Sequence, residues 1–373
     1  MSMRILRVVH RMYPPKIGGL SYHAHQLSAD QARDGHQVTV LTSVEGSYPK
    51  HEFRYGYEIF RDEALAWPLD NPINLGLLAR LLERSEGEYD VLHAHSHLMF
   101  TTNASALKRK LSSKPLIITN HGFRVRRGPL LNLFQDAYLA SLGRWTLQTA
   151  DWVISFTKRE RDLTVAAGAS PEKAVVIPNG VNTKLFRPTD CEPISKSVLW
   201  TGRYVEEKGL PYLLEAAELV LRDVPEAKFI LVGYGGQLPL LERLSEQLGL
   251  QSRVTFMAPK PQEEIAAILN RCTMFALPSL SEGFPNTVLE AMSCRKPVLV
   301  TSGIGLEEIV GDAGLYAKAG DPRSIADRII SILRDERLAE DLGSHGRTRV
   351  CGMYDWEKTV KETTRLFERA TKY

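Results

Sequence analysis

Short runs of apolar residues alternate along this chain with longer segments in which apolar residues recur every three or four positions. A run without polar alternation is typical of a strand buried on both faces of a parallel sheet. The longer segments are typical of helices that pack one face against such a sheet. The runs that predict strands are residues 5–9, 37–43, 90–97, 115–119, 152–156, 198–203, 228–235, 253–257, 274–278, 298–300 and 314–317. The segments that predict helices are residues 21–34, 74–85, 101–111, 158–167, 210–222, 238–248, 263–270, 288–294, 321–335, 337–351 and 356–371.

Strands and helices alternate in two separate series, which predicts an α/β protein with two doubly wound domains. A turn-rich stretch at residues 175–193 separates the two series. We therefore place the boundary after residue 188, with a first domain at 1–188 and a second at 189–355. A chain of 373 residues is also too long for one ordinary hydrophobic core.

Composition places the chain among soluble globular proteins, with 43% apolar and 24% charged residues. A net charge of +3 is too small to indicate a nucleic-acid partner. The four cysteines show no metal-binding spacing and are expected to stay reduced in the cytoplasm. The first ten residues predict a short strand and not a signal peptide, and no run of about 20 apolar residues is long enough to span a bilayer.

The loop, helix and strand predicted at residues 278–300 carry two carboxylates, Glu282 in the loop and Glu290 in the helix. Asn286 or Thr287 is expected to cap this helix. The free N–H groups at a helix start favour a phosphate or another anion, and a carboxylate further along can accept hydrogen bonds from sugar hydroxyls. Both glutamates equally fit solvated surface positions.

Loops after two other predicted strands carry residue types that bind phosphate. Arg203 and Lys208 follow a strand of the second domain; Arg can grip a diphosphate through two bonds, and Lys acts as a point charge. Gly18-Gly19 follows the first strand of the chain and lets backbone N–H groups approach a ligand. Surface cations and tight turns explain the same residues without a ligand. Neither this loop nor Gly233 belongs to a GxGxxG motif.

Histidines gather near the carboxyl ends of two predicted strands of the first domain. His93, His95 and His97 occupy alternate positions, where they could share one face of a strand and hold a metal ion. We expect them to line a cleft instead, because no Asp, Glu or Cys with suitable spacing lies nearby. His121 follows the apolar run 115–119, a position where α/β sheets place functional residues. A histidine hydrogen-bonded within a turn is the alternative.

The segment 124–145 is basic and amphipathic. Its apolar residues recur at near-helical spacing, and four arginines accompany a single aspartate. A segment of this kind can lie on an anionic membrane surface, or it can be a helix packed on its own domain. The four arginines are Arg124, Arg126, Arg127 and Arg144.

In order and spacing, these motifs resemble those of the retaining GT-B glycosyltransferases of family 4, which include mannosyl-, glucosyl- and N-acetylglucosaminyltransferases. The resemblance spans nearly the whole chain, and its last motif is the family's pair of glutamates separated by seven residues. The matching motifs are Gly18-Gly19, Gly35-His36, Asp90–His95, Asn120-His121-Gly122, Ile177–Asn182, Gly202-Arg203 with Lys208-Gly209, and Pro278–Ala291 with Glu282 and Glu290.

The resemblance implies two Rossmann-like domains that face a cleft, with the acceptor on the first and a nucleotide-diphosphate sugar on the second. The last helix, at about 356–373, is expected to cross back to the first domain. Four residues are implied to take part directly in catalysis: His121, Glu282, Arg203 and Lys208. The residues implied to bind the nucleotide sugar are Gly18, Gly19, Gly202, Arg203, Lys208, Gly233, Glu282, Gly283, Phe284, Asn286, Thr287 and Glu290.

Within this set the resemblance assigns separate roles. Arg203 and Lys208 would hold the diphosphate, Glu290 the ribose hydroxyls and Glu282 the donor sugar. Backbone N–H groups of Phe284, Asn286 and Thr287 would assist Glu282. His121 would contact the sugar near its reacting carbon, and the Gly18-Gly19 loop would approach the phosphates.

The implied reaction moves a hexosyl group from a UDP- or GDP-sugar to an acceptor hydroxyl, with retention at the anomeric carbon. No cofactor and no metal ion are expected, because basic residues and a helix start can stabilise the leaving diphosphate. We expect a glycan or lipid-linked acceptor and a cytoplasmic protein, with peripheral contact to the inner face of the cell membrane through 124–145.

Three other functions stay open. One is a GT-B sugar-nucleotide epimerase or hydrolase, which would convert the donor without an acceptor. Another is a binding protein for sugar nucleotides without catalytic activity. The third is a nicotinamide-dependent oxidoreductase, which is disfavoured because neither domain has GxGxxG followed by an acidic residue about 20 positions later.

Overall fold

The structure is a computed structural model that describes residues 2–14, 18–44, 46–122 and 129–372. The chain divides into two compact units, one formed by residues 1–178 with 359–373 and the other by residues 179–358. The sequence-based boundary lies after residue 188 instead. The structure places the intervening residues in the second unit because Val181 and Phe186 are buried in its core.

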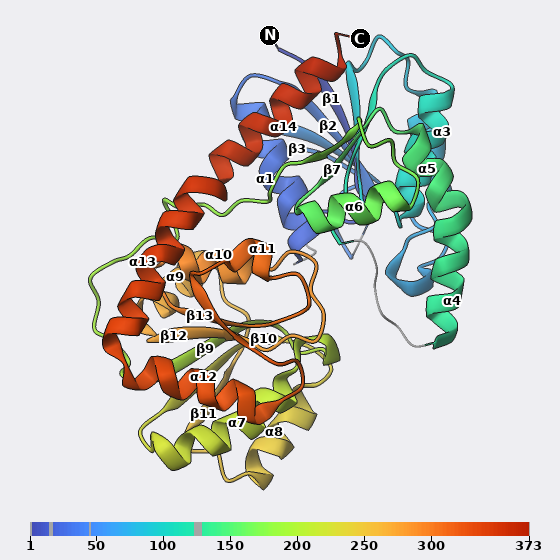
Figure 1. Cartoon of the computed structure of the whole chain (residues 1–373). Coiled ribbons are helices and arrows are strands. Elements are labelled where there is room, and N and C mark those ends of the chain that lie inside the picture. Colours follow the sequence, from blue (N-terminus) through green and yellow to red (C-terminus); the bar gives the residue numbers. More distant parts are fainter. Residues whose placement is uncertain (1, 15–17, 45, 123–128, 373) are drawn as a thin grey trace. The chain divides into compact units, whose positions relative to one another are not determined.

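The first unit contains an eight-stranded sheet with the order β3-β4-β2-β1-β5-β6-β7-β8 (Figure 1). Neighbouring strands are parallel except for β3 and β4, which form an antiparallel pair at one edge. The strands are β1 (Arg4–Val8), β2 (Gln37–Ser43), β3 (His51–Arg54), β4 (Tyr57–Asp62), β5 (Val91–His95), β6 (Leu116–Thr119), β7 (Trp152–Ser155) and β8 (Ala174–Val176). The helices are α1 (Gly19–Arg33), η1 (Pro68–Asp70), α2 (Leu75–Glu83), α3 (Phe100–Lys110), α4 (Pro129–Tyr138), the π-helical turn η2 (Leu139–Gly143), α5 (Arg144–Thr149) and α6 (Lys158–Ala166).

Apolar layers cover both faces of this sheet, because successive residues of a strand point to opposite sides. Ile5 belongs to the layer that also contains Phe367 of the last helix, α14 (Trp356–Ala370). Leu6, the next residue, belongs to the opposite layer with Leu77 of α2 and Leu147 of α5. The end of α14 thus completes the core of the first unit, which confirms that the C-terminal helix returns to the N-terminal domain.

The second unit contains a six-stranded, fully parallel sheet with the order β11-β10-β9-β12-β13-β14. Helices α7, α8 and α12 cover one face, and α9 and α10 cover the other (Figure 1). The strands are β9 (Ser197–Arg203), β10 (Lys228–Tyr234), β11 (Val254–Met257), β12 (Met274–Leu277), β13 (Val298–Thr301) and β14 (Gly314–Ala317). The helices are η3 (Glu206–Lys208), α7 (Leu210–Asp223), α8 (Leu238–Gln247), α9 (Gln262–Arg271), α10 (Asn286–Ser293), α11 (Glu307–Val310), α12 (Pro322–Arg334) and α13 (Glu336–Met353).

Two local features differ from the sequence-based expectations. The turn-rich stretch after residue 172 contains the short strand β8, whose three residues pair with β7 at the edge of the sheet. The expected capping of α10 by Asn286 or Thr287 is wrong. Pro285 precedes the helix and no side chain caps it. The Asn286 Oδ1 instead accepts a hydrogen bond from Asn179 Nδ2 at 2.8 Å.

Candidate active site

The second sheet brings two loops together at its carboxyl edge. Strands β9 and β12 are parallel neighbours at the point where the strand order reverses, which is where α/β sheets bind ligands. The Leu280 N–H, in the loop after β12, donates to the Glu207 carbonyl in the loop after β9 at 2.8 Å. A Cβ on Gly209 would lie 2.2 Å from the Pro278 carbonyl oxygen, and Gly209 has a left-handed φ of +64°. Close backbone contact therefore holds the two loops in place.

An ion pair joins the predicted site residues of these loops. Lys208 Nζ lies 2.6 Å from Glu282 Oε1, and the exposed fractions of the two side chains are 19% and 6%. The Ser279 hydroxyl donates to the same Glu282 oxygen at 2.6 Å. Ser279 was not predicted from the sequence, although it lies three residues before Glu282 in the same loop. The structure thus places Lys208 next to Glu282.

Two further predicted residues lie on elements that begin or end at this edge. Arg203 is the last residue of β9, and its side chain is exposed. Glu290 lies one helical turn after Asn286 and on the same face of α10. Burial raises the pKa of Glu290 to about 7, and no hydrogen bond to its carboxylate is found among the described residues. The carboxylate is therefore available for the hydroxyl groups of a ligand.

The predicted glycines fall into two groups. Gly202 and Gly233 face each other on neighbouring strands, and a Cβ on Gly233 would lie 1.9 Å from the Gly202 carbonyl oxygen. Packing alone thus requires glycine at position 233. A Cβ on Gly18 or Gly19 would meet nothing within 4 Å, so a ligand can approach that backbone closely. Gly283 is exposed, and ligand contact by any of the five remains a prediction.

Histidines gather at the corresponding edge of the first sheet. Strands β5 and β6 are neighbours, with His95 in register with Thr119, and His121 follows two residues later. His95 Nδ1 and His121 Nε2 are 3.0 Å apart. The ring of His23, from the start of α1, lies 5.0 Å from that of His121 and 5.8 Å from that of His95. His23 was not predicted, although it lies one turn after Gly18-Gly19.

The sequence-based trio of alternate histidines does not form one group. Strand β5 ends at His95, and Ser96 has a φ of 65°, so the alternation of side chains stops there. His97 Nδ1 is 2.8 Å from Asn120 Oδ1 instead. His93 accepts a hydrogen bond from Arg7 at 3.1 Å, and its other ring nitrogen is 2.8 Å from the Thr119 hydroxyl.

Burial determines the protonation of two histidines of this cluster. It lowers the pKa values of His95 and His121 well below the usual value for histidine, and neighbouring titratable groups lower them further. Both rings are therefore neutral at pH 7. The Glu160 carboxylate accepts hydrogen bonds from the Gly122 and Phe156 N–H groups at 2.8 and 2.7 Å, which holds the backbone at Gly122, next to His121. Neutral imidazoles in this position can exchange hydrogen bonds with hydroxyl groups.

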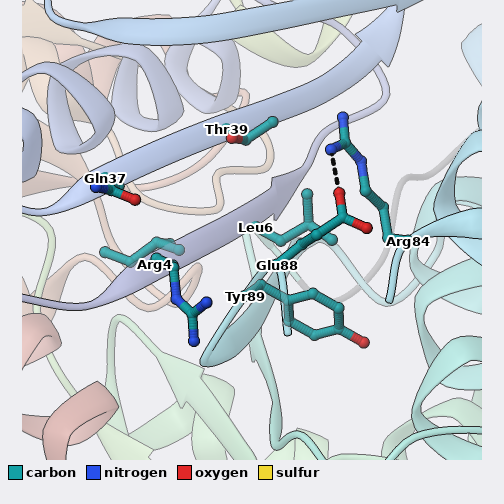
Figure 2. Close-up of a pocket in the computed structure, with 8 residues that line it drawn as sticks. Arg4, Leu6, Gln37, Thr39, Arg84, Glu88 and Tyr89 are labelled. Atoms are coloured by element: carbon teal, nitrogen blue, oxygen red, sulfur yellow. Dashed lines mark hydrogen bonds and ion pairs between the residues drawn. The ribbon is translucent and has the colours of Figure 1, made fainter. Parts of the chain in front are cut away.

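A shallow pocket lies at the opposite, amino edge of the first sheet (Figure 2). Arg4 and Gln37, which line it, are the first residues of β1 and β2. Both guanidinium groups at this pocket are paired: Arg4 with Asp90 at 2.6 Å and Arg84 with Glu88 at 2.5 Å. Since these charges already have partners and lie away from the carboxyl edge, we assign the pocket no role in catalysis.

No helix in the described ranges combines the length and apolar character needed to cross a bilayer. The segment 124–145 is described only from Pro129 onward, as α4, η2 and the start of α5. Three of its four arginines, at positions 124, 126 and 127, lie outside the described residues.

Two family models match the sequence, one for each half of the chain. The model of glycosyltransferase family 4 matches residues 17–185, and the model of group 1 glycosyl transferases matches residues 184–349. The chain belongs to the family 4 glycosyltransferases. An uncharacterised glycosyltransferase of Methanocaldococcus jannaschii is 28% identical over 385 residues, which cover 96% of each chain.

Two further similarities bear on this glycosyltransferase. A phosphatidylinositol N-acetylglucosaminyltransferase component of Arabidopsis thaliana is 25% identical over 385 residues, covering 100% of this chain and 83% of the relative. The structure of HepE from Anabaena in complex with UDP-glucose matches with a TM-score of 0.81 at 20% identity, over 98% of this chain and 100% of HepE. The predicted GT-B fold and enzyme class are thereby confirmed.

Proposed function

We propose that this glycosyltransferase moves a hexosyl group from a UDP-sugar to an acceptor hydroxyl and retains the anomeric configuration. The observation that carries the proposal is the meeting of Lys208, Glu282 and the start of α10 at one sheet edge. The likeness to HepE, which was solved with UDP-glucose, supports a uridine nucleotide over a guanosine nucleotide.

The leaving nucleoside diphosphate gains negative charge as the glycosidic bond breaks. Lys208, Arg203 and the N–H groups at the start of α10 stabilise this charge, so the transfer needs no metal ion. Lys208 is held by Glu282 before the donor binds. When Lys208 turns to the diphosphate, Ser279 keeps Glu282 in place through its own hydrogen bond. Glu282 is then positioned to accept hydrogen bonds from the donor sugar.

Glu290 binds the ribose in this proposal. Its side chain is half-buried, and no hydrogen bond to its carboxylate is found in the part of the chain that the structure describes, so the partly desolvated charge lacks partners. Two ribose hydroxyls would supply the missing donors. For His121 the family resemblance implies a contact with the sugar near its reacting carbon, where a neutral imidazole is suitable because a fixed positive charge would oppose the oxocarbenium-like transition state.

Thermal shift with UDP-glucose, UDP-N-acetylglucosamine and GDP-mannose tests the donor, because a ligand bound only by the folded state raises the melting temperature. We expect a rise with at least one UDP-sugar and a smaller one with GDP-mannose. Lys208→Ala should remove most of the rise. A larger shift with GDP-mannose would contradict the choice of base.

Mass analysis of the donor with and without a membrane-lipid extract then tests the reaction. Transfer predicts donor loss only when the extract is present, and an added hexose on a lipid product. Conversion of the donor without the extract would identify an epimerase or hydrolase. NMR of the product reports the anomeric configuration, and inversion would contradict the retaining mechanism.

We further propose that the acceptor is carried by a membrane lipid and that the 124–145 segment contacts the membrane. Leu133, Phe134 and Leu142 are large apolar residues of this segment, and they are 65%, 63% and 43% exposed. Arg144 nearby is also exposed and can pair with anionic lipid headgroups. The relative whose name includes phosphatidylinositol supports a lipid acceptor.

Sedimentation with vesicles that contain anionic lipid tests this contact. We expect binding at low salt that is lost when Leu133 and Phe134 are both changed to Ser. Arg126→Ala with Arg127→Ala should weaken it as well. Leu240→Ser is the control, because Leu240 is 49% exposed but lies on α8 of the second unit. Absence of binding by the unchanged protein at low salt would refute the proposal.

A further inference from the structure

Three histidine side chains from separate elements converge at the carboxyl edge of the first sheet. His23 comes from α1, His95 from the end of β5 and His121 from the loop after β6. One ring nitrogen of each lies within 4.8 Å of the others. Nitrogens bound to one zinc ion at about 2.0–2.1 Å are roughly 3.4 Å apart in a tetrahedron. Small rotations of the rings would therefore bring all three to ligand distance.

His95 Nδ1 and His121 Nε2 are 3.0 Å apart, a hydrogen-bond distance somewhat shorter than the roughly 3.4 Å between two ligands of one zinc ion, so a bound metal would replace this hydrogen bond. His95 is fully buried, and its Nε2 has no hydrogen-bond partner among the described residues. An unsatisfied buried nitrogen is costly for a fold, and it is the kind of group that a ligand satisfies.

We propose that His23, His95 and His121 form a binding site for one zinc ion, with a fourth position open to water or a substrate hydroxyl. Imidazole is a favoured ligand for zinc, and three protein ligands with one open position are common in zinc sites that stay reactive. The alternate spacing of His93, His95 and His97 was the only sign of a metal site in the sequence, and no metal was expected there. The structure selects a different trio, because His23 and His121 reach the His95 ring from other elements.

The surroundings define the limits of this site. The His93 ring lies 4.3 Å from that of His95, but both His93 nitrogens are engaged by Arg7 and Thr119, so it is not a ligand. The buried Arg7 guanidinium opposes a second positive charge nearby. The Glu160 carboxylate, which binds the N–H next to His121, offsets part of that repulsion.

The zinc site has a consequence for transfer that rests on the proposed function. If His121 contacts the donor sugar, zinc occupies the same imidazole and inhibits transfer. Zinc binding itself does not depend on that role. Binding without inhibition would therefore refute the placement of His121 at the sugar and leave the zinc site intact.

Equilibrium dialysis of chelator-treated protein against zinc sulfate, with elemental analysis, tests the site. We expect one zinc ion per chain. His23→Gln and His95→Asn should each weaken binding by roughly 100-fold or more, because loss of an outer-shell partner alone costs about 10- to 100-fold. His51→Gln and His345→Gln are matched controls with exposed rings, and should bind as the unchanged protein does.

Cobalt substitution gives a second readout. The visible spectrum of Co²⁺ should show a four-coordinate site with nitrogen ligands and no sulfur-to-cobalt band. A sulfur band would move the site to a cysteine and overturn the proposal. So would zinc binding that is absent, or that persists in both His23→Gln and His95→Asn. Circular dichroism and melting curves identify a variant that fails to fold, and the other variant then decides.

Discussion

The strand order reverses in both sheets of this glycosyltransferase, but the side chains beside the two reversal points differ in type. At the carboxyl edge of the first sheet, beside β1 and β5, the side chains are histidines that are buried or half-buried, and the neighbouring Gly18-Gly19 has open space around it. At the corresponding edge of the second sheet, beside β9 and β12, the side chains are charged. Backbone atoms there pack against Gly209 and Gly233 and leave no room for a Cβ.

This difference shows that the strand order determines where the loops meet, whereas the residue types determine which ligand group can bind there. Strand order brings loops together at the switch point in both units. Charge then determines which ligand group each edge suits. Lysine and arginine suit a diphosphate, whereas neutral imidazoles suit hydroxyl groups or a metal ion. Experiments that alter one edge and spare the other test whether the division is real.

Removal of the Lys208 charge should have the largest effect. We expect Lys208→Ala to lower turnover by on the order of 10²-fold or more, the scale of losing one transition-state charge contact. Steady-state kinetics with a UDP-sugar measure it. Lys228→Ala is the control, because Lys228 is exposed at the amino end of β10 in the same sheet. Turnover near that of the unchanged protein would remove the diphosphate assignment.

The contrast between packed and open glycines predicts a difference in stability. Gly233→Ala should lower the free energy of unfolding by about 1–3 kcal/mol, the usual cost of overpacking, because its Cβ would clash with the Gly202 carbonyl. Gly19→Ala should leave stability unchanged, since its Cβ meets nothing, and should weaken donor binding. Chemical denaturation and donor titration measure the two effects. Equal destabilisation by both changes would contradict the contrast.

The raised pKa of Glu290 predicts a pH dependence of donor binding. The carboxylate accepts the ribose hydroxyls only when it is deprotonated, so affinity should fall by about tenfold from pH 8 to pH 6, one unit below its pKa of about 7. Calorimetry with UDP-glucose is suitable, because its diphosphate does not titrate in this range. In Glu290→Gln the affinity should be lower and nearly independent of pH. If Glu290→Gln showed the same pH dependence of donor affinity as the unchanged protein, the role of Glu290 would be refuted.

The Glu290 carboxyl should affect the free energy of unfolding in the opposite direction, so that a rise in pH lowers it while donor affinity increases. Because its pKa is raised in the folded state, the folded protein binds more protons than the unfolded chain between about pH 4.5 and 7. Ligand-free stability contributed by this carboxyl is therefore lost as the pH rises through that window. Melting curves should show Glu290→Gln to be more stabilising at pH 8 than at pH 5.

The alternation of apolar runs and helical segments was sufficient to predict two Rossmann-like domains, because strand and helix periodicity are local properties of the sequence. The motifs predict Lys208, Glu282 and Glu290 as site residues, and the structure pairs the first two. The local sequence could not show that Asn286 does not cap α10. Its side-chain oxygen instead accepts a hydrogen bond from Asn179, which lies 107 positions earlier in the chain.

The sequence by itself determined the elements, the enzyme class and the loops that carry charge. The tertiary structure alone decided which side chains meet. Lys208 reaches Glu282 across 74 residues because β9 and β12 are neighbours. His23, His95 and His121 converge because β1, β5 and β6 are adjacent. Strand order depends on how helices pack on the two faces of a sheet, and no local spacing of residues encodes it.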